Sequence, residues 1–354
     1  MDFAPDPVTE AVGDVAGEAF ARLDADWTDR FTAHHFDVAA WDAVVAAGLT
    51  ALPLPASAGG DAVPLTAAAV LAARAGRSAA VTPLLGTLAA AAVLNSAPAR
   101  VVEHWAPSIA CGAWCAAAVS APGRALGDEP SLRLRKTPDG MRLDGRASGV
   151  LHADGATALM VGAVGGAVLV RPSAPGVRCV RTTSSSGWGE YTVAFDDVPV
   201  DPTDLLDDHW RPISDAYRAL LLAYAGGVLA EALEMTARHV SERRQFGKPI
   251  AAFQAVRQQL ADAYVVSRGL QLAATSASWR LSTGRDAAAD LGAACYWLAA
   301  EGPSTLETLT HLHGGLGVDL SYPLHRYFSI TKDLARLVGG ADAQLDLLAA
   351  ETAC

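Results

Sequence analysis

One short segment of the chain combines residue types that could bind a nucleotide. Residues 241–254 read S-E-R-R-Q-F-G-K-P-I-A-A-F-Q, and the side chains of interest are Arg243, Arg244, Gln245, Phe246 and Gln254. Guanidinium groups suit a pyrophosphate because they form paired, charge-assisted hydrogen bonds, whereas an aromatic ring and amides suit a base. The spacing alone leaves a second interpretation open: a solvated helix end whose arginines complement the helix dipole.

Long helices are expected to position this segment. Gly247 and Pro249 predict a break between two helices. A period of 3.6 residues predicts helices over residues 214–246, 252–281 and 286–313, with Ser214 as the N-cap of the first. Helices this long, with small residues on one face, predict a close-packed antiparallel bundle.

The hydrophobic pattern divides the chain into three predicted domains. Residues 1–108 are predicted to be helical, with one helix over residues 38–47 and two alanine-rich helices within residues 65–94. Residues 109–207 contain many short segments with a period of two, separated by turn residues, which predicts a small antiparallel barrel or sandwich. Residues 208–354 form the predicted helical bundle.

Composition excludes several classes of function. The net charge is −11 and no basic run is present, which argues against a nucleic-acid partner. Arg74, Arg77, Pro83 and Gly86 interrupt the alanine-rich segment, so no membrane insertion is expected. The five cysteines lack metal-ligand spacing, and no metal site is predicted; Cys111 and Cys115 are interpreted as small core residues in a strand-like run. No secretory leader is recognised, so a cytoplasmic protein is expected.

Four motifs in order resemble the acyl-CoA dehydrogenase family over nearly the whole chain. They are G-L-T-A-L-P-L-P…G-G, W-G-E-Y-T-V-A-F-D-D-V-P-V, E-R-R-Q-F-G-K-P-I-A-A-F-Q and H-L-H-G-G-L-G-V…Y-P-L-H-R-Y. The resemblance implies an α+β multidomain fold with an N-terminal helical domain, a central antiparallel β-barrel or sandwich and a C-terminal four-helix bundle. It also implies α,β-desaturation of an acyl-CoA thioester, FAD bound between subunits, and an electron-transfer flavoprotein as the acceptor.

The resemblance assigns cofactor contacts to residues of this chain. Arg243 matches the arginine that reaches the FAD pyrophosphate of a neighbouring subunit, and Phe246 and Gln254, with Gln245 beside them, match the adenine end. The glycine turn that approaches the cofactor corresponds to Gly314, Gly315 and Gly317, with His311 where the family often has glutamine. Ser120 keeps the hydroxyl of the family's flavin-edge strand.

The catalytic half of the family's site is not retained, and no catalytic residue is assigned. The position of the catalytic glutamate holds Val338, and the alternative position on the first bundle helix holds Tyr217, whose ordinary pKa near 10 makes it a poor base. Near the flavin ring, the family's tryptophan and hydroxyl residue fall at Gly149 and Leu151. The acids nearest the two base positions are Asp215, Asp333 and Asp342, and each is more typical of a helix cap or an exposed acid.

Three hypotheses follow. The first is a subunit that completes a partner's FAD site, similar to the non-catalytic subunit of actinobacterial heteromeric acyl-CoA dehydrogenases that act on bulky, sterol-like acyl-CoAs, assembled as a heterotetramer. The second is a self-sufficient dehydrogenase, in a homo-oligomer, with a displaced base such as Asp215 or Asp342. The third is a flavin-free paralogue that serves as a scaffold or acyl-CoA binding module.

Overall fold

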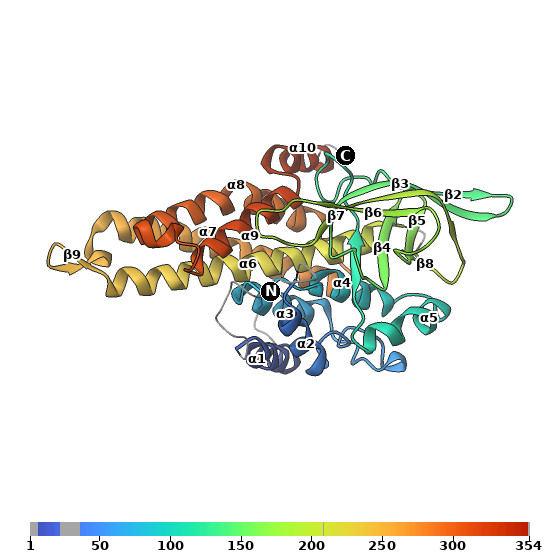
Figure 1. Cartoon of the computed structure of the whole chain (residues 1–354), viewed down its shortest axis with the longest axis horizontal. Helices are drawn as coiled ribbons and strands as arrows, with labels where there is room; N and C mark the ends of the chain where they lie inside the picture. Colours follow the sequence, from blue (N-terminus) through green and yellow to red (C-terminus); the bar gives the residue numbers. More distant parts are fainter. Residues whose placement is uncertain (1–5, 22–35, 208, 353–354) are drawn as a thin grey trace.

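The computed structural model describes residues 6–21, 36–207 and 209–352. The N-terminal helices form one layer beneath the long helices of the bundle, and the strands lie at one end of those helices (Figure 1). The elements of the first part are α1 (Pro7–Ala21), α2 (Val38–Ala46), η1 (Ala56–Ala58), α3 (Leu65–Arg77), α4 (Leu84–Leu94) and α5 (Ala99–Ala110). The alanine-rich segment is therefore two helices, α3 and α4, as predicted.

Small residues let the N-terminal layer approach the bundle closely. Helix α3 packs on α6 (Arg211–Glu242), the central helix of the bundle. A Cβ atom added to Gly227 of α6 would lie 2.0 Å from the carbonyl oxygen of Ala73, and one added to Gly76 of α3 would lie 2.0 Å from that of Tyr224. Any larger side chain at either glycine would push the two helices apart.

The central part of the chain forms two four-stranded sheets, with strand orders β1-β4-β5-β8 and β2-β3-β7-β6. The strands are β1 (Cys115–Ala118), β2 (Arg133–Thr137), β3 (Gly140–Leu151), β4 (Ala158–Ala163), β5 (Gly166–Val170), β6 (Val177–Thr182), β7 (Glu190–Val200) and β8 (Leu205–Asp207). The predicted run of short strands separated by turns is confirmed. The sheets do not close into a barrel, and β1 pairs with β4 in parallel. Parallel pairing is possible here because β2 and β3, in the other sheet, form a long crossover between the two strands.

Three long helices and two shorter ones form the C-terminal part of the described chain, where a helical bundle was predicted. After α6 come β9 (Arg244–Gln245), β10 (Lys248–Pro249), η2 (Ile250–Ala252), α7 (Gln254–Ser282), α8 (Ala288–His313), η3 (Gly314–Val318), α9 (Leu324–Leu337) and α10 (Ala341–Thr352). Of the described helices, α6 has the length and apolar composition of a membrane span, but 72% of its most apolar 18-residue window is buried within the fold.

The structure corrects several local predictions. Helix α6 begins at Arg211, so Ser214 is not its N-cap; the Ser214 hydroxyl is buried inside the helix and has no hydrogen-bond partner within the described residues. The helix ends at Glu242 rather than at Phe246, because a short hairpin follows. Cys111 is exposed at the end of α5, whereas Cys115 is buried in β1. The remaining cysteine at the C-terminus, Cys354, lies outside the described residues.

Candidate functional site

The predicted nucleotide-binding corner is a hairpin at the tip of the bundle. Strands β9 and β10 pair antiparallel, and the two residues between them, Phe246 and Gly247, both have positive φ angles, 51° and 79°. Positive φ at both central residues matches the twist of a hairpin, but it is strained for a phenylalanine. The carbonyl of Arg243 accepts a hydrogen bond from the Ile250 amide at 2.9 Å, which closes the hairpin against the end of α6. The residues predicted to bind a nucleotide therefore lie in a hairpin, and not at the end of a helix as expected.

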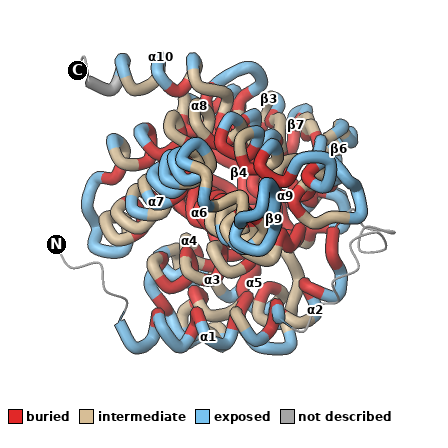
Figure 2. Tube along the Cα trace, turned by 90° about the vertical axis from the view of Figure 1, so that its left-hand side faces the viewer, coloured by how far each residue is buried: buried red, intermediate tan, exposed pale blue. Residues whose placement is uncertain are grey.

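The corner projects from the end of the bundle (Figure 1) and is solvent-exposed (Figure 2). The side chain of Phe246 is 91% exposed, and Arg243, Gln245 and Gln254 are exposed as well. No residue of the described ranges forms an ion pair with Arg243 or Arg244. An exposed aromatic ring beside free guanidinium groups is typical of a surface that binds an anionic aromatic ligand or a partner.

The glycine turn lies beside the last turns of α6. His313, at the end of α8, stacks on His239 of α6 with ring centroids 4.2 Å apart. Its Nε2 lies 3.1 Å from the Thr236 hydroxyl, which itself donates to the carbonyl of Ala232. That hydroxyl must therefore accept from Nε2–H, which assigns the tautomer. Burial and the neighbouring His239 lower the pKa of His313 to about 4, so the pair is neutral at pH 7.

Close backbone contact explains one of the three predicted glycines. Gly317 is buried, and a Cβ atom there would lie 2.4 Å from the carbonyl oxygen of Thr310. Gly314 has a positive φ of 63° and, like Gly315, is exposed with open space around it. His311 is also exposed in the last turn of α8. The structure thus brings the glycine turn and the corner to the same end of the bundle (Figure 1).

Ser120 lies apart from these residues, in the central β part of the chain. It follows β1 and lines a cavity of about 480 Å³, called the polar cleft here. The cleft is lined by hydroxyl, small and charged residues, among them Ser120, Ser148, Gly149, Thr182, Glu190 and Arg336. Gly149 has a φ of 64°, and a Cβ atom there would lie 2.8 Å from Leu337 Cδ2. Leu337 therefore takes the space that a tryptophan at position 149 would need.

Val338 is fully buried at the C-terminus of α9. Its carbonyl oxygen accepts hydrogen bonds from the Leu126 amide at 3.0 Å and from Gln344 Nε2 at 2.5 Å. The next residue, Gly339, has a φ of 102°, and a Cβ atom there would lie 2.7 Å from Ala125 Cα. The predicted base position is thus an apolar packing position with a fixed backbone.

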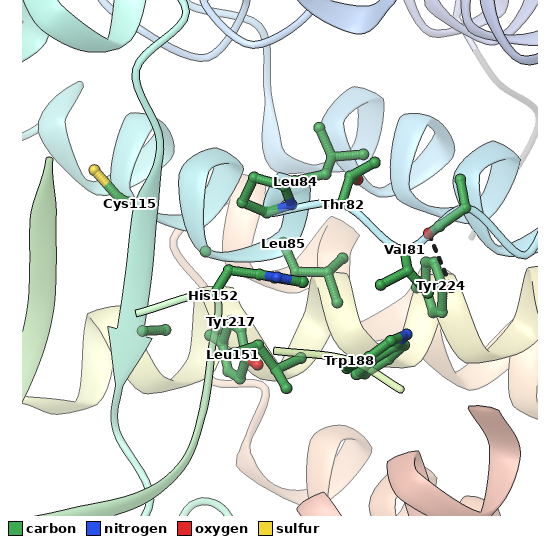
Figure 3. Close-up of a pocket in the computed structure, with 14 residues that line it drawn as sticks. Val81, Thr82, Leu84, Leu85, Cys115, Leu151, His152, Trp188, Tyr217 and Tyr224 are labelled. Carbon is green, nitrogen blue, oxygen red and sulfur yellow. Dashed lines mark hydrogen bonds between the residues drawn. The ribbon is translucent and has the colours of Figure 1, made fainter. Parts of the chain in front are cut away.

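Tyr217 lines a second cavity, called the apolar pocket here (Figure 3). Its walls are Ala80, Val81, Thr82, Pro83, Leu84, Leu85, Gly86, Cys115, Ala117, Leu151, His152, Trp188, Tyr217 and Tyr224. The volume is about 20 Å³, which is room for roughly one water molecule. Among the residues that the structure describes, no carboxylate lines the pocket, and burial raises the pKa of Tyr217 further above its ordinary value. Tyr217 is therefore not a base at neutral pH.

Aromatic residues close the apolar pocket. Trp188 is 2% exposed and packs edge-on against Tyr224, with ring centroids 6.0 Å apart. The Tyr224 hydroxyl donates to the carbonyl of Ala80 at 3.0 Å. Trp114 also serves in packing, and its indole donates to the carbonyl of His152 at 3.0 Å. Burial lowers the pKa of His152 to about 3.

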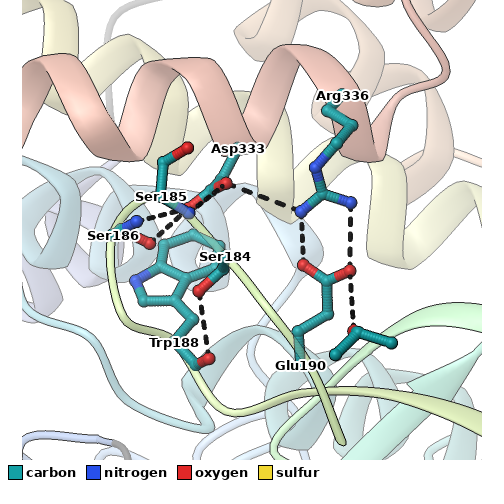
Figure 4. Close-up of polar contacts among 8 residues, drawn as sticks. Ser184, Ser185, Ser186, Trp188, Glu190, Asp333 and Arg336 are labelled. Atoms are coloured by element: carbon teal, nitrogen blue, oxygen red, sulfur yellow. Dashed lines mark hydrogen bonds and ion pairs between the residues drawn. The ribbon is translucent and has the colours of Figure 1, made fainter.

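A polar network that the sequence reasoning missed lies beside both cavities (Figure 4). Arg336 of α9 binds both carboxylate oxygens of Glu190 of β7, and its Nη1 lies 3.0 Å from Glu190 Oε1. Asp333 of α9 accepts hydrogen bonds from the amides of Ser185 and Ser186 at 2.9 and 2.7 Å. The spacing of Asp333 and Arg336 on one helix face was the available signal, but their partners lie 146 to 148 residues away.

The three acids considered as replacement bases have other roles. Asp333 is 1% exposed, so its interpretation as a cap or exposed acid is wrong: it is buried because it satisfies two turn amides and a hydroxyl. Asp215 lies 3.4 Å from the buried Arg218 guanidinium. Asp342 is exposed in the first turn of α10, as expected for a helix-end acid. None of the three lines the apolar pocket.

Comparisons with known proteins agree with this architecture. The family model described as "Acyl-CoA dehydrogenase, C-terminal domain" matches residues 215–352. The chain is 40% identical to acyl-CoA dehydrogenase FadE28 of Mycobacterium tuberculosis over 353 residues, covering 99% of this chain and 98% of that protein. The chain belongs to the acyl-CoA dehydrogenase family.

Two solved structures show that the acyl-CoA dehydrogenase fold extends over the whole chain. The Tcur3481-Tcur3483 steroid ACAD G363A variant matches with a TM-score of 0.89 and 30% identity, covering 98% of this chain and 97% of that chain. The ChsE4-ChsE5 complex from Mycobacterium tuberculosis matches with a TM-score of 0.88 and 27% identity, covering 100% and 99%. Within this family, the chain has valine at the expected base position, and its apolar pocket, lined by Tyr217, is nearly filled.

Proposed function

We propose that this chain is a subunit of an FAD-dependent acyl-CoA dehydrogenase of hetero-oligomeric type. It completes the flavin site of a partner subunit and does not desaturate an acyl-CoA at its own site. The contrast between the exposed, unpaired Arg243 corner and the filled pocket around Tyr217 carries this proposal. The likeness to two solved structures whose names join two subunits, one of them a steroid acyl-CoA dehydrogenase, supports a second subunit and a bulky acyl group.

The residues at the corner fit one end of FAD. The free guanidinium groups of Arg243 and Arg244 suit its pyrophosphate, and the exposed ring of Phe246 suits the adenine. Gln245, Gln254 and His311 add hydrogen-bonding groups, and the turn at Gly314, Gly315 and Gly317 admits a close approach of the backbone. Bound FAD supplies the acceptor for the hydride that leaves the β-carbon of the acyl group.

This chain's own residues do not support the other half of the reaction. Removing the proton α to the thioester carbonyl requires a carboxylate of raised pKa beside the substrate. Val338 and Tyr217 cannot supply one, and a pocket of about 20 Å³ cannot hold an acyl chain. The partner subunit therefore provides the base, the acyl-binding pocket and the contacts to the flavin ring. An electron-transfer flavoprotein is the proposed acceptor of the electrons.

The proposal is tested by co-expressing the chain with a family member that retains the glutamate. We expect the purified complex to be yellow, and the isolated chain to bind little FAD and not to oxidise octanoyl-CoA. Arg243→Ala should weaken FAD binding by the complex about 10- to 100-fold, because a charge-assisted pair is lost. Arg178→Ala, at an exposed arginine of β6, is the matched control and should leave binding unchanged.

Two outcomes would overturn this assignment. Stoichiometric FAD together with turnover by the isolated chain would show a self-sufficient enzyme with a base elsewhere. A colourless complex with the partner would show a flavin-free scaffold, and the arginines of the corner would then serve the partner's surface rather than its cofactor.

A further inference from the structure

The turn between β6 and β7 separates the two cavities. Thr182 and Thr183, where the turn begins, line the polar cleft, and so does Glu190, where it ends. Between them, Trp188 forms a wall of the apolar pocket. This one segment therefore supplies wall residues to both cavities.

The turn is fastened to helix α9. Asp333 accepts hydrogen bonds from the Ser185 amide at 2.9 Å, from the Ser186 amide at 2.7 Å and from the Ser186 hydroxyl at 2.5 Å. Inside the turn, the Ser184 hydroxyl donates to the carbonyl of Trp188 at 3.1 Å. Hydrogen bonds to a buried carboxylate are stronger than those between neutral groups, so α9 holds the turn firmly.

The positive charge of Arg336 compensates the negative charges of two buried acids, Glu190 and Asp333. Glu190 is 3% exposed and Asp333 1% exposed, and two uncompensated carboxylates at such positions would be costly. Arg336 pairs with both oxygens of Glu190, and its Nη2 lies 3.5 Å from Asp333 Oδ1. The Glu190 carboxylate raises the pKa of Arg336, so the guanidinium stays charged. The network joins strand β7, the turn and α9 across the edge of the polar cleft (Figure 4).

We propose that Glu190, Asp333 and Arg336 lock the β6–β7 turn in a closed position. The lock keeps Trp188 in the apolar pocket, divides the pocket from the polar cleft and thereby excludes an acyl thioester from this subunit. The identity of the excluded ligand rests on the proposed function. The lock itself is a property of this chain alone and is tested without a partner or flavin.

The test is hydrogen exchange and ligand binding on the isolated chain. Asp333→Asn keeps the size of the side chain but replaces one of the two acceptor oxygens by an NH2 group, which cannot accept from the turn, and removes the negative charge. We expect the exchange of the Ser185 and Ser186 amides to rise at least about tenfold, and octanoyl-CoA binding, undetectable in the wild type by calorimetry, to become measurable. Asp342→Asn, at an exposed acid of α10, is the control and should change neither.

Either of two results would overturn the lock. Unchanged exchange in Asp333→Asn would show that α9 does not hold the turn. Faster exchange without octanoyl-CoA binding would show that the turn does not keep an acyl thioester out of the apolar pocket. If Asp333→Asn does not fold, Glu190→Gln replaces it in both measurements, amide exchange and octanoyl-CoA binding. This substitution removes the ion pair with Arg336 but keeps the shape of the side chain. The FAD proposal is tested independently: if Arg243→Ala did not weaken FAD binding by the complex, the results on the lock would still stand.

Discussion

The pH dependence of stability tests whether the apolar pocket is dry and filled. His152 is 4% exposed in its wall, and no described residue hydrogen-bonds to its Nδ1. Burial lowers its pKa from 6.5 to about 3. The unfolded chain therefore binds more protons than the folded chain between these two values, and stability must fall as the pH drops from 6.5 towards 3.

The size of this effect follows from the shift. At pH 5 His152 is charged in the unfolded chain and neutral in the folded chain, which costs about 2 kcal/mol relative to pH 7, at about 1.4 kcal/mol per pH unit below 6.5. Other groups with a lowered pKa, including His313, also reduce the stability of the fold in this pH range. A variant is therefore needed to isolate the contribution of His152. His152→Asn removes the titrating ring and suits the backbone, whose φ is 56°.

The assay is urea unfolding of both proteins at pH 7 and pH 5, followed by circular dichroism. We expect the wild type to lose about 2 kcal/mol more than His152→Asn between the two pH values. Equal losses, within about 0.5 kcal/mol, would refute the reasoning, because a histidine in an open, hydrated acyl pocket would titrate near its ordinary pKa in both states.

Two further predictions concern the packing that surrounds this pocket. Val338→Glu should lower the melting temperature, since Val338 is fully buried and a carboxylate there would be desolvated. It should also produce no oxidation of octanoyl-CoA in a dye-reduction assay, because the apolar pocket of about 20 Å³ has no room for an acyl chain; dye reduction above background would contradict this. Gly227→Ala should destabilise the chain by about 3 kcal/mol in urea unfolding, because its Cβ would lie 2.0 Å from the Ala73 carbonyl oxygen in the α3–α6 contact. Gly17→Ala is the control: it is helical with open space around it, and it should stabilise by up to about 1 kcal/mol. Equal effects of the two glycine substitutions would show that the α3–α6 contact is looser than described.

Local chemistry made the overall architecture predictable. The period of the hydrophobic pattern is set by residues that are close together in the sequence, and its change separates helical segments from strand segments. The strands and long helices that it predicts are present in the structure. The break at Gly247 and Pro249 was predictable for the same reason. The conformation of the corner was not, because residues up to Phe246 continue the helical pattern, and the hairpin forms only when the chain leaves α6 at Glu242.

Burial of polar groups was the main source of error. Ser214 and Asp333 have the residue types of helix caps, but both lie inside helices that pack against other elements. Asp333 is stabilised by a turn 148 residues away along the chain, and Glu190, visible in the W-G-E-Y motif, is paired with an arginine 146 residues away. A pattern over a few neighbouring residues does not indicate hydrogen-bond or ion-pair partners that lie this far away along the chain.

The sequence by itself determined the family resemblance, the residue types of the corner and the valine at the expected base position, Val338, since these depend on residue identity at matched positions. Only the tertiary structure decided that the corner is exposed and unpaired, that Tyr217 lies in a pocket of about 20 Å³, and that the β6–β7 turn is bound to α9. The physical reason is that exposure, cavity volume and charge pairing are set by the side chains that other segments bring to a site, and those segments are distant along the chain.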